Sequence, residues 1–109
     1  MKNLTPKPPT DLSKDAKKFW LGLRDEYDIR DCAGIDLLTD AARFYDRREQ
    51  AREAIRKDGP TLLDRFSQVV AHPAVRIERD ASASLQRCLK ALNLDLEPVK
   101  ARPGRPGGR

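Results

Sequence analysis

The sequence has very few of the residues that build metal sites and disulfides. Its cysteines are Cys32 and Cys88, its single histidine is His72, and no C-x-x-C or H-x-x-x-H spacing occurs. This pattern suggests neither a disulfide framework nor a zinc site, so we predict no metal and no cofactor. A free cysteine behaves as a small hydrophobic residue, and we expect both to be reduced packing residues.

Long hydrophobic runs are also missing. No stretch approaches the roughly 20 apolar residues that a membrane span needs, and no apolar run follows the N-terminal lysines, as a secretory signal would require. Charged residues make up 36% of the chain and hydrophobic ones 39%, which is typical of a soluble helical protein with large wet faces. We therefore expect a cytoplasmic protein with no membrane partner.

Catalytic motifs are absent as well. The sequence has no G-x-x-x-x-G-K-[ST] loop to hold phosphates and no paired carboxylates in a metal-binding context. The spacing of His72, Cys32 and Cys88 assembles no catalytic triad. These absences predict a protein that is not an enzyme and has no catalytic residue.

What the chain does have is positive charge at both ends. Residues 1–18 hold five lysines and two aspartates, or +3, and residues 98–109 hold four bases and no acid, or +4. The remaining 79 residues hold 13 bases and 15 acids, or −2, which accounts for the total of +5. Basic ends on a nearly neutral body indicate a polyanionic partner, although basic tails can also serve only solubility.

The N-terminal part reads as an arm followed by a helix. Pro6, Pro8 and Pro9 predict an extended, flexible arm over residues 1–12, and Ser13 is a suitable N-cap for a helix that ends near Tyr27. Gly22 inside this helix suggests that a neighbouring helix or subunit lies close to it. The apolar stripe comprises Ala16, Phe19, Trp20, Leu23 and Tyr27.

A long second helix follows a turn over residues 28–36. We expect Asp36 to cap it and Gly59-Pro60 to end it. Its apolar positions cover an arc of about 180°, wider than one partner helix needs, so we predict an oligomer. Arg48 and Arg52 lie inside this arc, where they either reach outward beyond the end of the packing partner or meet acidic groups of another subunit or DNA. The predicted oligomer interface is Leu37, Phe44, Arg48, Arg52 and Ile55.

Residues 61–71 predict a short β-hairpin, with Leu62-Leu63 and Val69-Val70 as its two strands. An isolated hairpin is marginally stable in water, so it should lie on the helices or on another chain. Pro73 suits the first turn of a third helix, and His72 then takes the cap position. A structural cap is one interpretation of His72; a ligand or general base is the other.

The third helix is predicted over residues 73–92, with Asn93 as a left-handed stop. Its apolar face, from Ala74 to Leu92, is interrupted only by Glu78. The opposite face carries four bases and one acid, which is either a solvated surface or a binding surface. The bases are Arg76, Arg79, Arg87 and Lys90, and the acid is Asp80. The expected fold is therefore mainly α, a three-helix core with a long central helix and a β-hairpin between the second and third helices.

The order of these segments resembles the small terminase subunits of tailed phages and prophages, over roughly residues 8–109. The resemblance rests on LSKDAKKFW, GIDLLTDAARFYDRREQAREAI, a short apolar hairpin, HPAVRIERDASASLQRCLKALNLD-LEP and the RPGRPGG tail. Asn93 stands where family members more often have glycine, and both residues tolerate a left-handed C-cap. An obvious helix-turn-helix is lacking.

The resemblance implies a non-catalytic DNA-packaging factor in the host bacterial cytoplasm. Such subunits form homo-oligomeric rings, engage double-stranded viral DNA and present it to the large terminase subunit, which carries the ATPase and nuclease. It implies an arm over 1–12, a helical oligomerisation and DNA-packaging domain over 13–95 and a disordered basic tail over 96–109. The expected DNA contacts are Lys14, Lys17, Lys18, Arg76, Arg79, Arg87, Lys90, Lys100, Arg102, Arg105 and Arg109.

Two other functions remain open at this point. One is a helical adaptor that docks on a larger enzyme without DNA, in which case the tail serves only solubility. The other is a small regulator, such as a toxin–antitoxin or transcriptional protein, which predicts a dimer and a defined operator.

Overall fold

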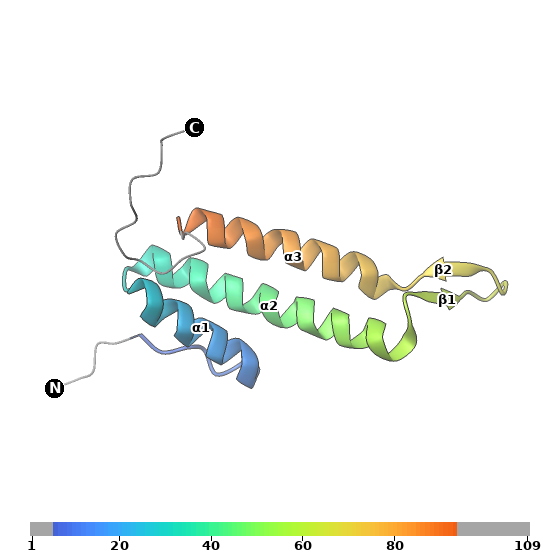
Figure 1. Ribbon diagram of the computed structural model, residues 1–109, viewed down its shortest axis with the longest axis horizontal. Coiled ribbons are helices and arrows are strands. Elements are labelled where there is room, and N and C mark those ends of the chain that lie inside the picture. Colours follow the sequence, from blue (N-terminus) through green and yellow to red (C-terminus); the bar gives the residue numbers. More distant parts are fainter. Residues whose placement is uncertain (1–5, 94–109) are drawn as a thin grey trace, which may run out of the picture.

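The computed structural model describes residues 6–93, which form three helices and one β-hairpin (Figure 1). The helices are α1 (Lys14–Tyr27), α2 (Cys32–Asp58) and α3 (Pro73–Ala91), and the strands are β1 (Thr61–Leu63) and β2 (Val69–Ala71). The strands pair antiparallel between α2 and α3, with Leu62 opposite Val70. The predicted mainly α fold with a long central helix is confirmed.

Most helix ends follow local signals in the sequence. The Ser13 hydroxyl accepts a hydrogen bond from the Ala16 amide at 3.0 Å, as expected of an N-cap. Gly59, at φ 83°, follows the last residue of α2, and its N–H donates to the Ile55 carbonyl. Asn93 adopts a left-handed conformation at φ 62° just after α3. These positions are the predicted ones.

The start of α2 differs from the prediction. Asp31, not Asp36, is the N-cap, and its carboxylate accepts a hydrogen bond from the Gly34 amide at 2.9 Å. A Cβ added to Gly34 would lie 2.7 Å from the Asp31 Oδ1 atom and 2.9 Å from Ile29. The glycine therefore leaves the space that this cap needs, and α2 begins at Cys32, inside the predicted turn.

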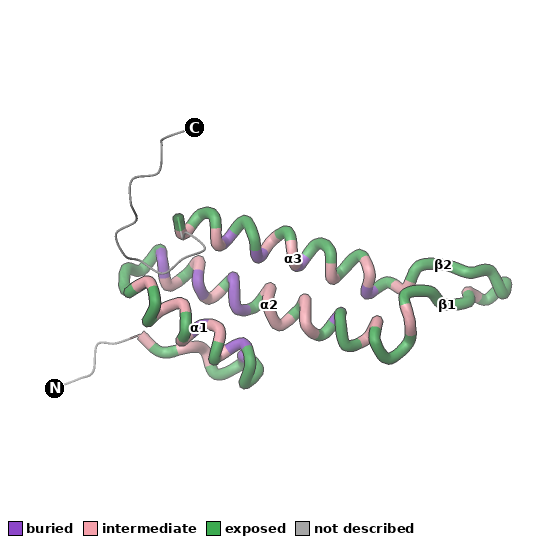
Figure 2. The backbone as a smooth tube through the Cα atoms, in the orientation of Figure 1, coloured by how far each residue is buried: buried purple, intermediate pink, exposed green. Residues whose placement is uncertain are grey.

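The core has two parts, both toward the end of α2 that α1 covers (Figure 2). Trp20 of α1 and Leu38 of α2 are fully buried in the first part, where the Trp20 indole N–H donates to the Thr39 hydroxyl at 3.2 Å. In the second part, Leu85 of α3 packs with Ala41 of α2. The predicted apolar faces of the three helices thus meet on α2.

Part of the predicted arm lies against the helices. Residues 1–5 are outside the described residues. Residues 6–9 have no regular secondary structure and residues 10–12 form a turn, not the predicted extended chain, and the segment follows α1 (Figure 1). Leu12 is buried in the first core part, and the Pro6 carbonyl accepts a hydrogen bond from Arg24. No described residue lies within 4 Å of a Cβ added to Gly22, so residues 6–93 do not make the expected close approach at this glycine.

Candidate nucleic-acid and assembly surfaces

A basic stripe runs along the outer face of α3. At about 100° and 1.5 Å per residue, its four members fall within an arc of about 80° and extend over about 21 Å of helix. The stripe lies on the side opposite Leu85, which is buried against α2. The predicted DNA contacts of this helix are thus brought together on one surface: Arg76, Arg79, Arg87 and Lys90.

Within the described part of the chain, these bases make only local contacts. Arg79 is 70% exposed and lies 3.9 Å from the Asp80 carboxylate, while the Arg87 Nη2 donates to the Ser84 hydroxyl at 3.0 Å. Exposed pairs of this kind contribute about 0–1 kcal/mol. Both guanidinium groups can therefore exchange these partners for a phosphate at small cost.

The lysines expected to contact DNA from α1 form a separate group. Lys14 and Lys18 are exposed and Lys17 is half-buried. Helices α1 and α3 flank α2 on opposite sides (Figure 1), so these lysines do not extend the α3 stripe. The tail bases lie outside the described residues: Lys100, Arg102, Arg105 and Arg109.

The arginines inside the apolar arc of α2 have acceptors in their own chain. Arg52 donates to the Glu78 carboxylate of α3 at 3.1 Å and to Glu49 at 3.1 Å. Arg48 donates to Glu49 at 3.0 Å and lies 5.2 Å from the centre of the Tyr45 ring. The interpretation that the packing partner has ended at this turn is therefore wrong, because α3 continues alongside α2. Arg52 and Glu78, the charges that interrupt the two apolar faces, pair with each other.

The other expected interface residues are only partly exposed. Phe44 is half-buried against the second core part, together with Leu85. Leu37 lines an open pocket of about 310 Å³ near Ile29 and Leu92, and Ile55 is half-buried. The five expected interface positions do not form one continuous exposed apolar surface, because Arg48 and Arg52 separate Phe44 from Ile55.

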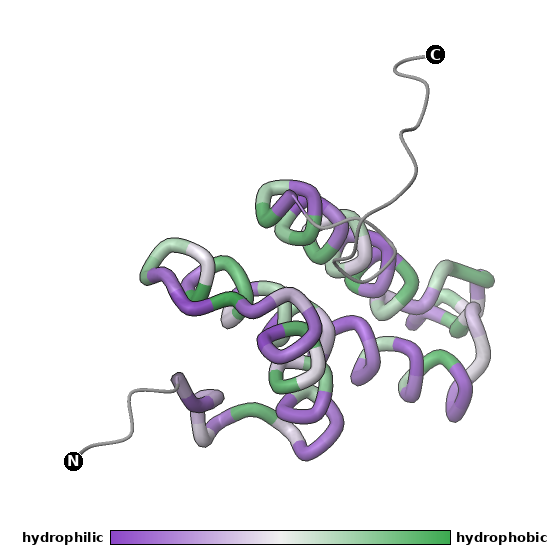
Figure 3. Tube along the Cα trace, turned by 60° about the vertical axis from the view of Figure 1, so that its left-hand side comes forward, coloured by the Kyte–Doolittle hydropathy of each residue, from purple (hydrophilic) through white to green (hydrophobic). Residues whose placement is uncertain are grey.

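A larger exposed apolar surface lies on the hairpin, which the expected site residues did not include. Figure 3 shows hydrophobic positions along it, and Leu63, Phe66 and Val69 are 67%, 68% and 70% exposed. We call these three residues the apolar tip. The signal in the sequence is Phe66, an aromatic residue inside a turn that is otherwise polar. The Asp64 carboxylate holds this turn by accepting hydrogen bonds from the Phe66 and Gln68 amides.

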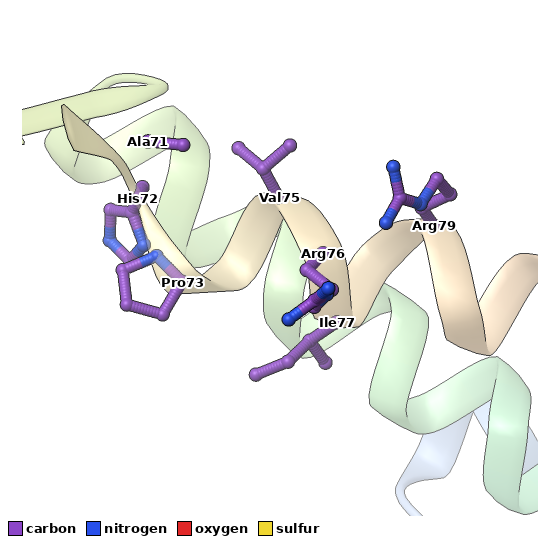
Figure 4. Close-up of a pocket in the computed structure, with 7 residues that line it drawn as sticks. All are labelled: Ala71, His72, Pro73, Val75, Arg76, Ile77 and Arg79. Carbon is purple, nitrogen blue, oxygen red and sulfur yellow. The ribbon is translucent and has the colours of Figure 1, made fainter.

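Open pockets flank the start of α3, beside the hairpin. One of about 520 Å³ runs from Ala71 to Arg79 along the first turns of α3 (Figure 4). The other, of about 450 Å³, lies between α2 and α3 and includes Ala54 and Arg47. His72, Pro73 and Ile77 line both pockets, and we call the two together the distal groove.

His72 and the cysteines have structural surroundings. His72 Nδ1 accepts a hydrogen bond from the Ala74 amide at 3.0 Å, and Nε2 lies 3.0 Å from the Asp58 carboxylate, so the ring is the predicted cap of α3. Cys32 is exposed. Burial raises the pKa of the Cys88 thiol above its ordinary value of 9.0, the nearby charge of Asp40 adds to this, and Arg87 opposes it.

Residues 6–93 offer neither a metal-binding cluster nor a membrane-spanning helix. No group of three or more histidine, cysteine or acidic side chains in this range could hold a metal ion. None of its helices is long and apolar enough to cross a membrane.

The comparisons with known proteins identify a family. The family described as "Phage terminase, small subunit" matches residues 16–100, which includes α1 from its third residue on, the hairpin, α2 and α3. The comparisons with curated proteins and with solved structures returned no match. The chain therefore belongs to the phage terminase small subunit family, a family of DNA-packaging subunits, as the order of its sequence segments predicts.

Proposed function

We propose that this chain is a non-catalytic, ring-forming subunit that engages double-stranded viral DNA and recruits the large terminase subunit in the host bacterial cytoplasm. The observation that carries the proposal is the family match over residues 16–100. The exposed basic stripe of α3 supports the DNA contact, because its bases have only weak local partners. The large subunit supplies the ATPase and nuclease that DNA packaging requires.

The proposed DNA contact is electrostatic. Each phosphate neutralised on double-stranded DNA contributes about −0.9 to the slope of log K against log salt concentration. Four stripe contacts thus give a slope of about −3.6 per subunit, or a roughly 100-fold loss of affinity between 50 and 200 mM salt. A ring multiplies these weak contacts through effective concentration.

The α1 lysines and the tail bases are proposed as further phosphate contacts. They are Lys14, Lys17, Lys18, Lys100, Arg102, Arg105 and Arg109. Because α1 and α3 lie on opposite sides of α2 (Figure 1), one subunit would use the α1 lysines on a different DNA segment from the stripe or on a neighbouring turn. The proposed domain boundaries remain 1–12, 13–95 and 96–109.

The test measures DNA affinity against salt concentration by fluorescence anisotropy of a labelled duplex. We expect Arg79→Gln/Arg87→Gln to weaken binding and to make the slope shallower by about 1.8 per subunit. Arg30→Gln is the matched control, because Arg30 is 78% exposed, pairs with Asp28 of the same turn at 2.8 Å and does not belong to the stripe. It should change neither quantity.

Removal of residues 98–109 tests the tail separately. If neither this deletion nor the double α3 variant changes the affinity or the slope, the assignment of DNA contacts is wrong. Recruitment of the large subunit is tested by pull-down from a nuclease-treated lysate. If the large subunit binds there and the chain shows no affinity for DNA, the function is that of an adaptor; a dimer with one defined operator would instead indicate a regulator.

A further inference from the structure

We propose that the apolar tip of one chain docks into the distal groove of a second copy. This inference rests on the proposed function only in that it concerns an oligomer, and it names the surfaces that hold the copies together. Five of the six large hydrophobic residues that are exposed in the described part of the chain belong to the hairpin, and the sixth, Ile77, lies in the groove.

The hairpin lacks cover from its own chain. All six strand residues are exposed, and among the described residues the strands pack extensively only on each other. A two-stranded hairpin is at best marginally stable in water without a packing surface. An exposed apolar patch of this kind marks an interaction site.

The tip cannot reach the groove of its own chain. The His72 amide donates to the Pro60 carbonyl at 2.8 Å, which joins the two strands where they leave the helices. The strands then continue beyond the ends of α2 and α3 (Figure 1), so the tip points away from the groove. The complement of the tip must therefore come from another molecule.

The groove offers that complement. In its half of the α2–α3 pair the buried side chains are alanines, Ala51, Ala74 and Ala81, which leave space where the core end has Leu38 and Leu85. Its pockets of about 520 and 450 Å³ have room for aromatic and aliphatic side chains. An inserted Phe66 alone would bury about 150–250 Å².

Charge argues for a second copy and against DNA as the occupant. The turn carries one base, Arg65, whose guanidinium lies 5.1 Å from the centre of the Phe66 ring, and one acid, Asp64. A neutral tip is not drawn to phosphates, and it enters a groove bordered by Arg47, Arg76 and Arg79 without net repulsion.

This contact repeats from copy to copy. Every copy carries one tip and one groove, and the two are different surfaces, so the contact is heterologous, and it closes into the proposed ring where the rotation between successive copies returns to the first. One tip buries far less than the roughly 1,600 Å² of a standard interface. We therefore expect other surfaces of the α2–α3 pair to add to it, and the loss of the tip to weaken assembly rather than the fold.

The experiment uses two variants of the full chain, measured by native mass spectrometry and light scattering. Leu63→Thr/Phe66→Ser/Val69→Thr removes the tip and keeps β-forming residues in the strands; Ile77→Glu blocks the groove. Each should raise the concentration needed for assembly at least about tenfold, which is 1.4 kcal/mol or more. Gln68→Thr, an exposed hairpin position outside the tip, is the matched control and should assemble as the wild type does.

Mixing the variants gives the decisive result. A chain without a tip still has a groove, and a chain with a blocked groove still has a tip, so the mixture should form a one-to-one dimer with twice the single-chain mass of 12.3 kDa. Circular dichroism melting verifies that both variants are folded. Because both changes are at exposed positions, we expect the melting temperature of the unassembled chain to be unchanged.

Several results would overturn the inference. If the wild type is an oligomer and both variants assemble as it does, the tip is not the contact, although the proposed function stands. If only the tip variant fails to assemble, the tip of one copy contacts the hairpin of another copy and not the distal groove, and the inference is wrong. If the wild type is a monomer whose tip binds only the large subunit, both the inference and the proposed ring are wrong. If the two variants and their mixture behave as expected but the wild type does not bind DNA, the inference stands and the DNA-engaging function fails.

Discussion

The cap of α3 permits a quantitative prediction, because His72 makes two separable contacts where the hairpin joins the helix. Its Nδ1 accepts from the Ala74 amide at 3.0 Å, so the neutral ring carries its proton on Nε2, which donates to the Asp58 carboxylate at 3.0 Å. The side chain is only 12% exposed. His72→Ala removes both contacts and keeps the backbone bond from the residue 72 amide to Pro60.

The magnitude follows from the two contacts. Loss of an N-cap acceptor costs about 1 kcal/mol. The contact with Asp58 adds about 0.5 kcal/mol, because that carboxylate is 49% exposed and solvent weakens the interaction. The total of about 1.5 kcal/mol corresponds to a fall of about 6–12 °C in melting temperature for a domain of this size.

The assay is chemical and thermal unfolding followed by circular dichroism at 222 nm, at one fixed protein concentration because assembly shifts the apparent stability. His72→Asn is the matched control. Asparagine is a good N-cap, so this variant should lose only the Asp58 contact, about 0.5 kcal/mol. If His72→Asn is as unstable as His72→Ala, the capping argument is refuted; if neither variant loses stability, both contacts are unimportant.

Three further predictions concern the helices. Leu38→Ala should destabilise the fold by about 2–5 kcal/mol in urea unfolding, because Leu38 is fully buried. A double-mutant cycle with Arg52→Ala and Glu78→Ala should give a coupling of about 0.5 kcal/mol, since both side chains are partly exposed. Iodoacetamide at pH 8 should alkylate the exposed Cys32 at a rate roughly 100-fold higher than the buried Cys88, as measured by mass spectrometry. The reason is that the raised pKa of the Cys88 thiol keeps it protonated, and the reagent reaches it only after local opening of the fold.

Each of these has a control and a contrary result. Leu21→Ala, at a half-buried position, should cost less than Leu38→Ala, and equal losses would contradict the placement of the core. Additive effects of the two charge changes would mean that the ion pair contributes nothing. In urea, the alkylation rates of the two cysteines should become equal, which is the positive control. Equal rates in native buffer would show that Cys88 is accessible in the folded chain.

Much of the fold could be predicted because its signals are local. Ser13 needs only the amide three residues later to cap α1, and Gly59-Pro60 ends α2 by backbone geometry alone. Pro73 begins α3 because its missing N–H is not needed there. These physical reasons act within one turn of chain, so the residues are visible as a pattern in the sequence.

The first turn of α2 could not be placed in this way. Asp31 and Asp36 are both acceptable caps by residue type, and the choice depends on the space that Gly34 leaves next to Ile29, which the fold brings there. In the candidate site, the α3 stripe follows from helical spacing. Its separation from the α1 lysines depends on which sides of α2 the two helices cover.

By itself, the sequence determined the helical segments, the hairpin, the basic face of α3, the family and the absence of motifs for phosphate or metal chemistry, because each of these is a matter of residue type and spacing. Only the tertiary structure decided that Arg52 pairs with Glu78 and that the apolar tip is left uncovered. Both depend on residues distant in the chain. Helix α3 runs beside the half of α2 that α1 does not cover, which brings Glu78 to Arg52, and the hairpin extends past the ends of both helices, where no part of the described chain can bury Phe66.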